Sequence, residues 1–237
     1  MKILLLADIH ANWPALSAIE ESFDACLFMG DVVDYAADPV PCIDWVRQCA
    51  TAWVRGNHDH SVAQRVQVRP GGTFRQISAA LRPGHLTVLN DDHLTWLAQM
   101  PVTRFLTLGG KRFMLVHASP RDPMDEYVQD SEEQWAARLE HVDVDFVCVG
   151  HTHIPMHLTI GSIQVINPGS VGQPRDGDPR ASYAVIQDGV VHFRRVHYDI
   201  DRAVRHIRAM CNDDVAAQRA EAVLRSGGNS TATTEFL

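Results

Sequence analysis

Short apolar and β-branched runs alternate with helical patterns through the first 150 residues of this 237-residue chain. This alternation limits the fold more than any other feature, because strands joined by crossover helices form a parallel sheet covered by helices. Five strands are predicted in this part of the chain, at residues 2–7, 25–29, 51–54, 111–117 and 144–149.

After residue 149 the pattern changes to hairpins. One is predicted at residues 156–166 around Gly161, and another at residues 182–197 around Asp188-Gly189, a favoured tight-turn pair. The second half of the sheet system is therefore predicted to be antiparallel.

Helices are predicted from start signals and from apolar periodicity. They follow Pro14, Pro39, Asn90 (to residue 99) and Ser131 (to residue 140), and they also occupy residues 200–210 and 215–224. Residues 61–89 contain the breaks Pro70-Gly71-Gly72 and Pro83-Gly84, so short helices and loops that can cover a site are expected there. We predict a single domain at residues 1–225 and a flexible tail at residues 226–237, which is rich in Gly, Ser and Thr.

Composition excludes several classes of protein. Hydrophobic residues make up 46% and charged residues 21%, which is typical of a soluble domain with a sizeable core. The apolar opening is interrupted by Asp8, too early for a signal peptide or a membrane span, so we expect a cytoplasmic protein without membrane attachment. Five cysteines without a C-x-x-C pair argue against a disulfide framework and against a thiolate zinc site.

The formal net charge is −8, and no block of lysine or arginine is present. A nucleic-acid polymer is therefore not expected as a partner. A small anionic substrate would need local positive charge, which bound metal ions can supply. The sequence leaves open whether the chain forms a homo-oligomer.

Side chains of the metal-binding type follow directly on the apolar strands. They are Asp8, His10, Asp31, Asn57, His58, Asp59, His117, His151 and His153. Ligands in open α/β sheets bind outside the carboxyl ends of the strands, so these residues can converge although they are distant in sequence. Asp8 and His10 are two positions apart, as are His151 and His153, and in extended chain each pair would share one face.

Carboxylates and imidazoles without thiolates suit manganese, iron, zinc or similar divalent cations better than calcium. At least seven of these residues are candidate ligands, more than one ion needs. Two ions about 3.5–4 Å apart would use them all, with one bridging carboxylate, and would clamp the attacking and leaving oxygens of a phosphoryl displacement. Asp31 is the expected bridge.

Five blocks in this order resemble the calcineurin-like metallophosphoesterases, most closely their small bacterial and archaeal phosphodiesterase-type members. The blocks are Asp8-Ile9-His10, Gly30-Asp31-Val32-Val33-Asp34, Gly56-Asn57-His58-Asp59, His117 and Gly150-His151-Thr152-His153. The loop at residues 167–175 is similar to a segment typical of these proteins. The resemblance implies an α/β fold, a four-layer α-β-β-α sandwich of two mixed sheets flanked by helices.

The resemblance also implies roles for individual residues. Asp8, His10, Asp31 and His153 would hold the first metal, and Asp31, Asn57, His117 and His151 would hold the second. Asn57 and His58 would contact the substrate, and His58 would protonate the leaving oxygen with Asp59 orienting its ring. A hydroxide bridging the two metals would be the nucleophile.

The expected activity is metal-dependent hydrolysis of a small phosphodiester, including nucleotides and dinucleoside polyphosphates. Asp34 is expected to stabilise its turn. Tyr35 occupies the place where the serine/threonine phosphatases of this superfamily have a phosphate-binding arginine. A phosphoprotein phosphatase is therefore the weaker alternative, and a non-catalytic scaffold of the same fold is weaker still. The roles of Arg55, His60 and Arg175 are left open.

Overall fold

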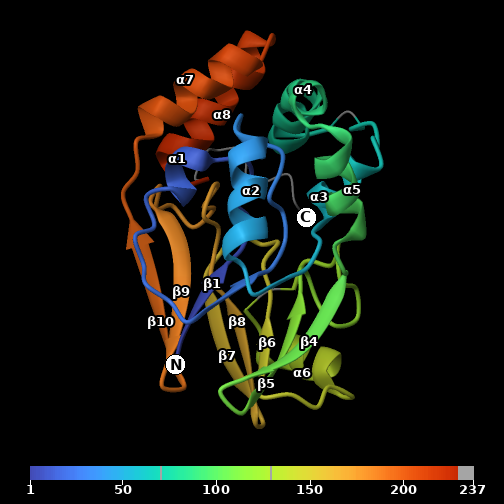
Figure 1. Ribbon diagram of the computed structural model, residues 1–237, viewed down its shortest axis with the longest axis vertical. Coiled ribbons are helices and arrows are strands. Elements are labelled where there is room, and N and C mark those ends of the chain that lie inside the picture. The colour runs from blue at the N-terminus through green and yellow to red at the C-terminus, as the bar shows by residue number, and fades with distance from the viewer. Residues whose placement is uncertain (70, 129, 229–237) are drawn as a thin grey trace.

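The computed structural model describes residues 1–69, 71–128 and 130–228, which contain ten strands and eight helices (Figure 1). In spatial order the first sheet consists of β10 (Val190–Val196), β9 (Ala181–Gln187), β1 (Lys2–Leu6), β2 (Ala25–Phe28) and β3 (Ala52–Trp53). The second consists of β4 (Thr103–Leu108), β5 (Lys111–Val116), β6 (Phe146–Cys148), β8 (Ile163–Asn167) and β7 (Met156–Ile160).

Both sheets are mixed. In the first, β1, β2 and β3 are parallel and β9 is antiparallel to β1. In the second, β5, β6 and β8 are parallel, whereas β4 and β7 are antiparallel to their neighbours. Both predicted hairpins are confirmed, but a purely antiparallel second half is wrong, because β8 pairs with β6 in parallel.

The described residues contain eight helices, and some of them cover the outer faces of the two sheets. The eight helices are α1 (Trp13–Leu16), α2 (Pro39–Cys49), α3 (Asn57–Ala63), α4 (Thr73–Val88), α5 (Asp91–Gln99), α6 (Glu132–Leu139), α7 (Ile200–Met210) and α8 (Asp214–Ser226). Buried residues of α1, α2 and α5 pack on the first sheet, and Trp135 of α6 packs on the second. The predicted four-layer sandwich is confirmed.

Strand β1 shows how the sequence produces these layers. Successive side chains of a strand point to opposite faces. Leu4 and Leu6 pack toward the helices, while Ile3 and Leu5 pack between the two sheets. A strand buried on both faces needs apolar residues at every position, which explains its continuous apolar run.

Helices α4, α7 and α8 form a separate cap above the carboxyl ends of the strands (Figure 1). The short helices expected within residues 61–89 are wrong, because α4 is one 16-residue helix that continues through Pro83-Gly84. Burial of Phe74, Ile77 and Leu81 against α7 and α8 outweighs the local breaking signal. Helix α8 extends to Ser226, and the predicted tail lies outside the described residues from position 229 onward.

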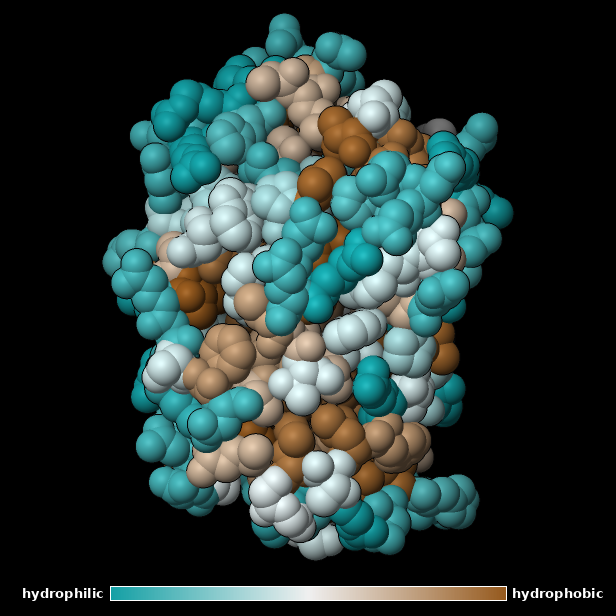
Figure 2. Space-filling view, in the orientation of Figure 1, coloured by the Kyte–Doolittle hydropathy of each residue, from teal (hydrophilic) through white to brown (hydrophobic). Residues whose placement is uncertain are grey.

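Exposed large apolar side chains lie on separate elements, such as Phe105 on β4, Val190 on β10 and Val215 on α8. In Figure 2, hydrophobic groups are interspersed with hydrophilic ones over the face shown. Scattered apolar residues of this kind are normal on a protein surface. None of the helices within the described ranges has the length and apolar character needed to cross a bilayer.

The loop that follows β8 packs directly on the loop that follows β1. Ser170 Oγ donates a hydrogen bond to the carbonyl of Asp8 (2.7 Å), and the amide of Gly172 donates to the same carbonyl (3.0 Å). A Cβ atom at Gly172 would lie 1.8 Å from the carbonyl oxygen of Ile9. Glycine is thus required for this contact, which joins the two sheets beside the strand ends.

We expect Gly172→Ala to destabilise the protein by about 3 kcal/mol, since the backbone must shift to relieve the clash. This corresponds to a fall in melting temperature of about 6–12 °C. Gly161→Ala is the matched control, because no atom lies within 4 Å of its added Cβ and only the left-handed backbone opposes alanine. Equal melting temperatures for the two variants would contradict this role of Gly172.

Candidate metal centre

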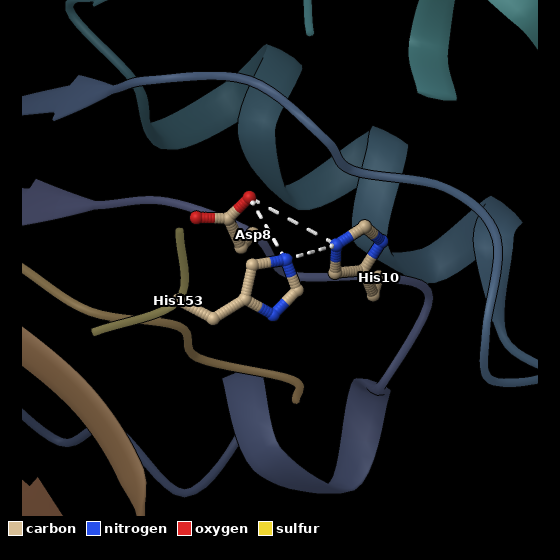
Figure 3. A group of neighbouring side chains, drawn as sticks. All are labelled: Asp8, His10 and His153. Carbon is tan, nitrogen blue, oxygen red and sulfur yellow. Dashed lines mark hydrogen bonds and ion pairs between the residues drawn. The ribbon is translucent and has the colours of Figure 1, made fainter. Parts of the chain in front are cut away.

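Asp8, His10 and His153 form one group of buried side chains (Figure 3). Asp8 and His10 follow β1, and His153 lies between β6 and β7. The Nε2 atoms of His10 and His153 are 3.1 Å apart, and Asp8 Oδ1 lies 3.9 Å and 3.5 Å from them. The three ligand atoms point toward one another, as the dashed lines in Figure 3 show.

Asp31, His117 and His151 form a second buried group. They follow β2, β5 and β6, so this group draws on both sheets. His117 Nε2 lies 3.2 Å from Asp31 Oδ2 and 3.2 Å from His151 Nδ1.

Asp31 lies between the two groups. Its Oδ2 atom, close to His117, is also 3.9 Å from His10 Nε2 in the first group. Its Oδ1 atom accepts a hydrogen bond from the backbone amide of His58 (2.9 Å). This geometry suits a carboxylate that serves both groups, as expected for the bridge.

The four imidazoles are oriented alike by backbone carbonyls. Each gives one ring N–H to a carbonyl oxygen: His10 to Val33, His117 to Met29, His151 to Asp125 and His153 to Gln173, at 2.6–3.3 Å. A carbonyl can only accept, so the other ring nitrogen of a neutral imidazole has its lone pair directed into the group.

These groups fit divalent cations. In each, two imidazole nitrogens face one another at 3.1–3.2 Å, where lone pairs repel unless a cation or a proton lies between them. Asn57 Oδ1 is buried and has no hydrogen-bond partner among the described residues. A bound metal ion would give this oxygen a partner. Oxygen and imidazole donors without thiolate suit manganese, iron or zinc.

Burial shifts the pKa values of these ligands. It lowers the pKa of His10 to about 3 and the pKa of His153 well below its usual range, so both imidazoles are neutral. Burial also raises the pKa of Asp8 to about 7. Against the effect of burial, Asp31 raises the pKa of His117 to about 10.

The backbone at the ligand positions is unusual. Asp8, His10, Asp31, His151 and His153 all have φ between 48° and 69°, in the left-handed region. The expectation that each Asp-x-His or His-x-His pair lies in extended chain is therefore wrong. Tight loops, rather than the alternation of a strand, direct both members of each pair into one group.

His58 is held by Asp34, not by Asp59. Its Nδ1 atom lies 2.7 Å from Asp34 Oδ2, and its side chain is 16% exposed. The carboxylate of Asp59 instead accepts backbone hydrogen bonds from Asp31 (2.8 Å), Val32 (2.8 Å) and Gly56 (3.0 Å). The orienting role expected for Asp59 is wrong, because Asp34 contacts the imidazole ring and backbone amides engage the Asp59 carboxylate.

A buried network extends from Asp34 into α4. Arg82 donates from Nε (3.2 Å) and from Nη2 to Asp34, and Ser78 Oγ donates to it at 3.0 Å. Burial raises the pKa of Asp34, but His58 and Arg82 outweigh that effect and lower it. The same carboxylate, together with Asp31, raises the pKa of His58 against the opposing effect of burial.

Of the residues left open, Arg175 is the one beside the ligands. Its backbone amide donates to the carbonyl of His153 (3.3 Å), and its guanidinium lies 4.0 Å from the ring centre of Phe74. Arg55 donates to the carbonyl of Ala98 (2.8 Å), at the end of α5. His60 belongs to neither group of ligands.

The contact of Asp34 with His58, and the part that Ser78 and Arg82 play in this network, were missed by sequence reasoning. A signal was present: Ser78, Arg82 and His85 recur at helical spacing among the apolar residues of α4, on the buried side. That spacing can be recognised only once residues 73–88 are assigned to one helix.

Comparison with known proteins agrees with this geometry. The family description "Calcineurin-like phosphoesterase superfamily domain" matches residues 1–188. A protein named "Probable metallophosphoesterase" from Mycoplasma pneumoniae is 27% identical over 206 residues, covering 82% of this chain and 98% of the relative. An uncharacterized protein of Methanocaldococcus jannaschii is 29% identical over 233 residues, covering 86% and 91%.

Two solved structures share the fold over almost the whole chain. The metallophosphoesterase from Sphaerobacter thermophilus has a TM-score of 0.79 and 30% identity, covering 96% of this chain and 99% of its own. A hypothetical protein from Pyrococcus horikoshii has a TM-score of 0.80 and 18% identity, covering 97% and 99%.

We expect two divalent ions per chain in the metal-loaded protein and a loss of metal in Asp31→Asn. Asp31 serves both groups, so the affinity should fall by more than about tenfold, since even residues that only support ligands typically contribute 10–100-fold. His58→Ala is the control and should retain both ions. Elemental analysis after gel filtration measures the stoichiometry. One ion in the wild type, or two in Asp31→Asn, would exclude a shared ligand.

Proposed function

The chain belongs to the calcineurin-like phosphoesterase superfamily, and from this premise we propose that it hydrolyses small phosphodiesters, including nucleotides and dinucleoside polyphosphates. As a metallophosphoesterase it is a metal-dependent hydrolase of phosphate esters. The observation that supports catalysis is the position of His58: Asp34 fixes its ring, whose centre lies 5.2 Å from that of His10 in one of the two groups able to hold metals.

Each set of residues has a separate task in this proposal. Asp8, His10, Asp31 and His153 hold one cation, and Asp31, Asn57, His117 and His151 hold the other. The bound cations supply positive charge for the phosphate oxygens and make water acidic enough to act as a nucleophile near neutral pH. His58 gives a proton to the leaving oxygen, while Asp34 keeps its ring in position.

The presence of Tyr35 favours the proposal of a small substrate over that of a phosphoprotein. Its ring is buried against His10 (4.6 Å between ring centres) and His58 (4.7 Å). A phenol at this place provides no permanent positive charge for phosphate, unlike the arginine of the serine/threonine phosphatases. With a net charge of −8, the chain has little to hold an extended anionic polymer.

Two alternative functions, a phosphoprotein phosphatase and a non-catalytic scaffold, predict different results in activity assays. A phosphoprotein phosphatase would prefer phosphoserine peptides. A non-catalytic scaffold, the least favoured alternative, would hydrolyse no ester at all, and the complete set of ligands with His58 argues against it.

We expect His58→Ala to lower kcat by about 10²–10⁴ for a substrate with a poor leaving group, the usual effect of losing a general acid. A substrate with a very good leaving group should be affected less, because that group needs little protonation. His60→Ala, a histidine of the same helix outside both ligand groups, is the control. Full activity of His58→Ala on the poor leaving group would contradict the assigned role.

We also expect kcat/KM to be higher for a model diester and for a dinucleoside polyphosphate than for a phosphoserine peptide. The measurement uses manganese-loaded protein at matched metal and salt concentrations. A tenfold preference for the peptide, about 1.4 kcal/mol in transition-state binding, would favour the phosphatase alternative.

A further inference from the structure

A cavity of about 380 Å³ lies beside the candidate metal centre. Asn57, His58 and His151 line one side of it, and Arg75, Asp125 and Tyr127 are among the residues that line the rest. Its volume is within the range of about 300–1,000 Å³ typical of ligand sites. The cavity can therefore hold the part of a substrate that extends beyond the reacting phosphate.

Two arginines line this cavity, but only one is engaged. Arg82 is bound to Asp34 and to the carbonyl of Val66 (2.9 Å). Arg75 is exposed, and it forms no hydrogen bond or ion pair with any residue in the described ranges. Its guanidinium is therefore the charge on the cavity wall that an anionic ligand can bind.

The position of Arg75 in α4 makes this charge unusual. It lies in the first turn of the helix, which contains no acidic residue. Positive charge near a helix N-terminus is opposed by the helix dipole, typically by about 0.3–1 kcal/mol. Positions where a protein departs from such a local rule are often functional ones.

The backbone that presents Arg75 is fixed on both sides. The preceding residue, Phe74, packs under the guanidinium of Arg175 at 4.0 Å. Two turns further along α4, Arg82 is bound to Asp34, the partner of His58. The first turn of α4 thus has a fixed position relative to His58.

We propose that Arg75 binds a second anionic group, carried by the part of the substrate that occupies the cavity. The preferred substrates are then phosphodiesters that bear another phosphate, such as nucleotides with two phosphate groups. Asp125 lines the same cavity, and its negative charge opposes that of the ligand. This inference rests on the proposed function, because it assumes that the reacting phosphate lies at the metal centre.

The test compares two ligands that differ by one phosphate, thymidine 5′-phosphate and thymidine 3′,5′-bisphosphate. Calorimetry on manganese-loaded protein should show that Arg75→Ala weakens binding of the bisphosphate about tenfold, equivalent to about 1.4 kcal/mol. Binding of the monophosphate should change less than about twofold. Arg75→Lys should recover part of the loss, and Asp125→Asn should strengthen binding of the bisphosphate.

Arg69→Ala is the matched control, because it removes the same charge from an exposed position outside the cavity. It should leave both affinities unchanged. Equal weakening of both ligands by Arg75→Ala, or a bisphosphate affinity that is independent of Arg75 and Asp125, would overturn the proposal.

Kinetics separate this inference from the proposed function. Thymidine 5′-(p-nitrophenyl phosphate), with and without a 3′-phosphate, gives the corresponding pair of substrates. Arg75→Ala should raise KM for the 3′-phosphorylated ester alone and leave kcat unchanged. If the wild type hydrolyses neither ester, the proposed function fails, whereas the calorimetric comparison still decides the role of Arg75.

Discussion

The buried carboxylate of Asp59 joins two segments beside the candidate metal ligands, the loop after β2 and the start of α3. By accepting the amide hydrogens of Asp31, Val32 and Gly56, it fixes the loop after β2 against the start of α3. The approach is close enough that a Cβ atom at Gly56 would lie 2.1 Å from Asp31 Oδ1. The shared carboxylate of Asp31 and the side chains at the start of α3 are therefore positioned by one interaction. Each buried amide left without a partner would cost about 1–3 kcal/mol, so this arrangement depends strongly on Asp59.

Such rigidity is needed because the ligand loops are strained. Left-handed backbone at a residue other than glycine costs about 1–3 kcal/mol and persists only where the surroundings impose it. Five of the proposed metal ligands adopt it, and so do Asp34 and Tyr35 next to His58. Backbone bonds from neighbouring loops impose these conformations, as when His10 donates to the carbonyl of Asp31 (3.0 Å). The fold thus concentrates unfavourable local geometry where the side chains must converge.

The strained loops and the contacts between them explain which features of the site could be predicted from the sequence. The convergence of strand ends could be predicted, because the ends of parallel strands must meet whatever the loops do. The contacts within the loops could not. Asp59 was expected to orient His58 because it is next in sequence, whereas Asp34, 24 positions away, lies nearer in space. Helix α4 was missed because Pro83-Gly84 signals a break locally, while its buried face is defined by distant segments, α7, α8 and the loop that contains Asp34 and Tyr35. Strand β4 was also not predicted, although Gly109-Gly110 connects it to β5.

Arg175 shows how one cation can prepare a centre that binds other cations. Repulsion alone would make an arginine unfavourable beside a metal site. Its charge nevertheless shifts the pKa of a carboxylate ligand and that of an imidazole ligand toward the forms that bind metal. Burial raises the pKa of the Asp8 carboxyl, and Arg175 acts against this larger effect by lowering that pKa. A lower pKa favours the ionised carboxylate. Arg175 also adds to burial in lowering the pKa of His153, which favours the neutral form. Ionised carboxylate and neutral imidazole are the forms that bind metal, so the charge of Arg175 prepares both types of side chain for a cation.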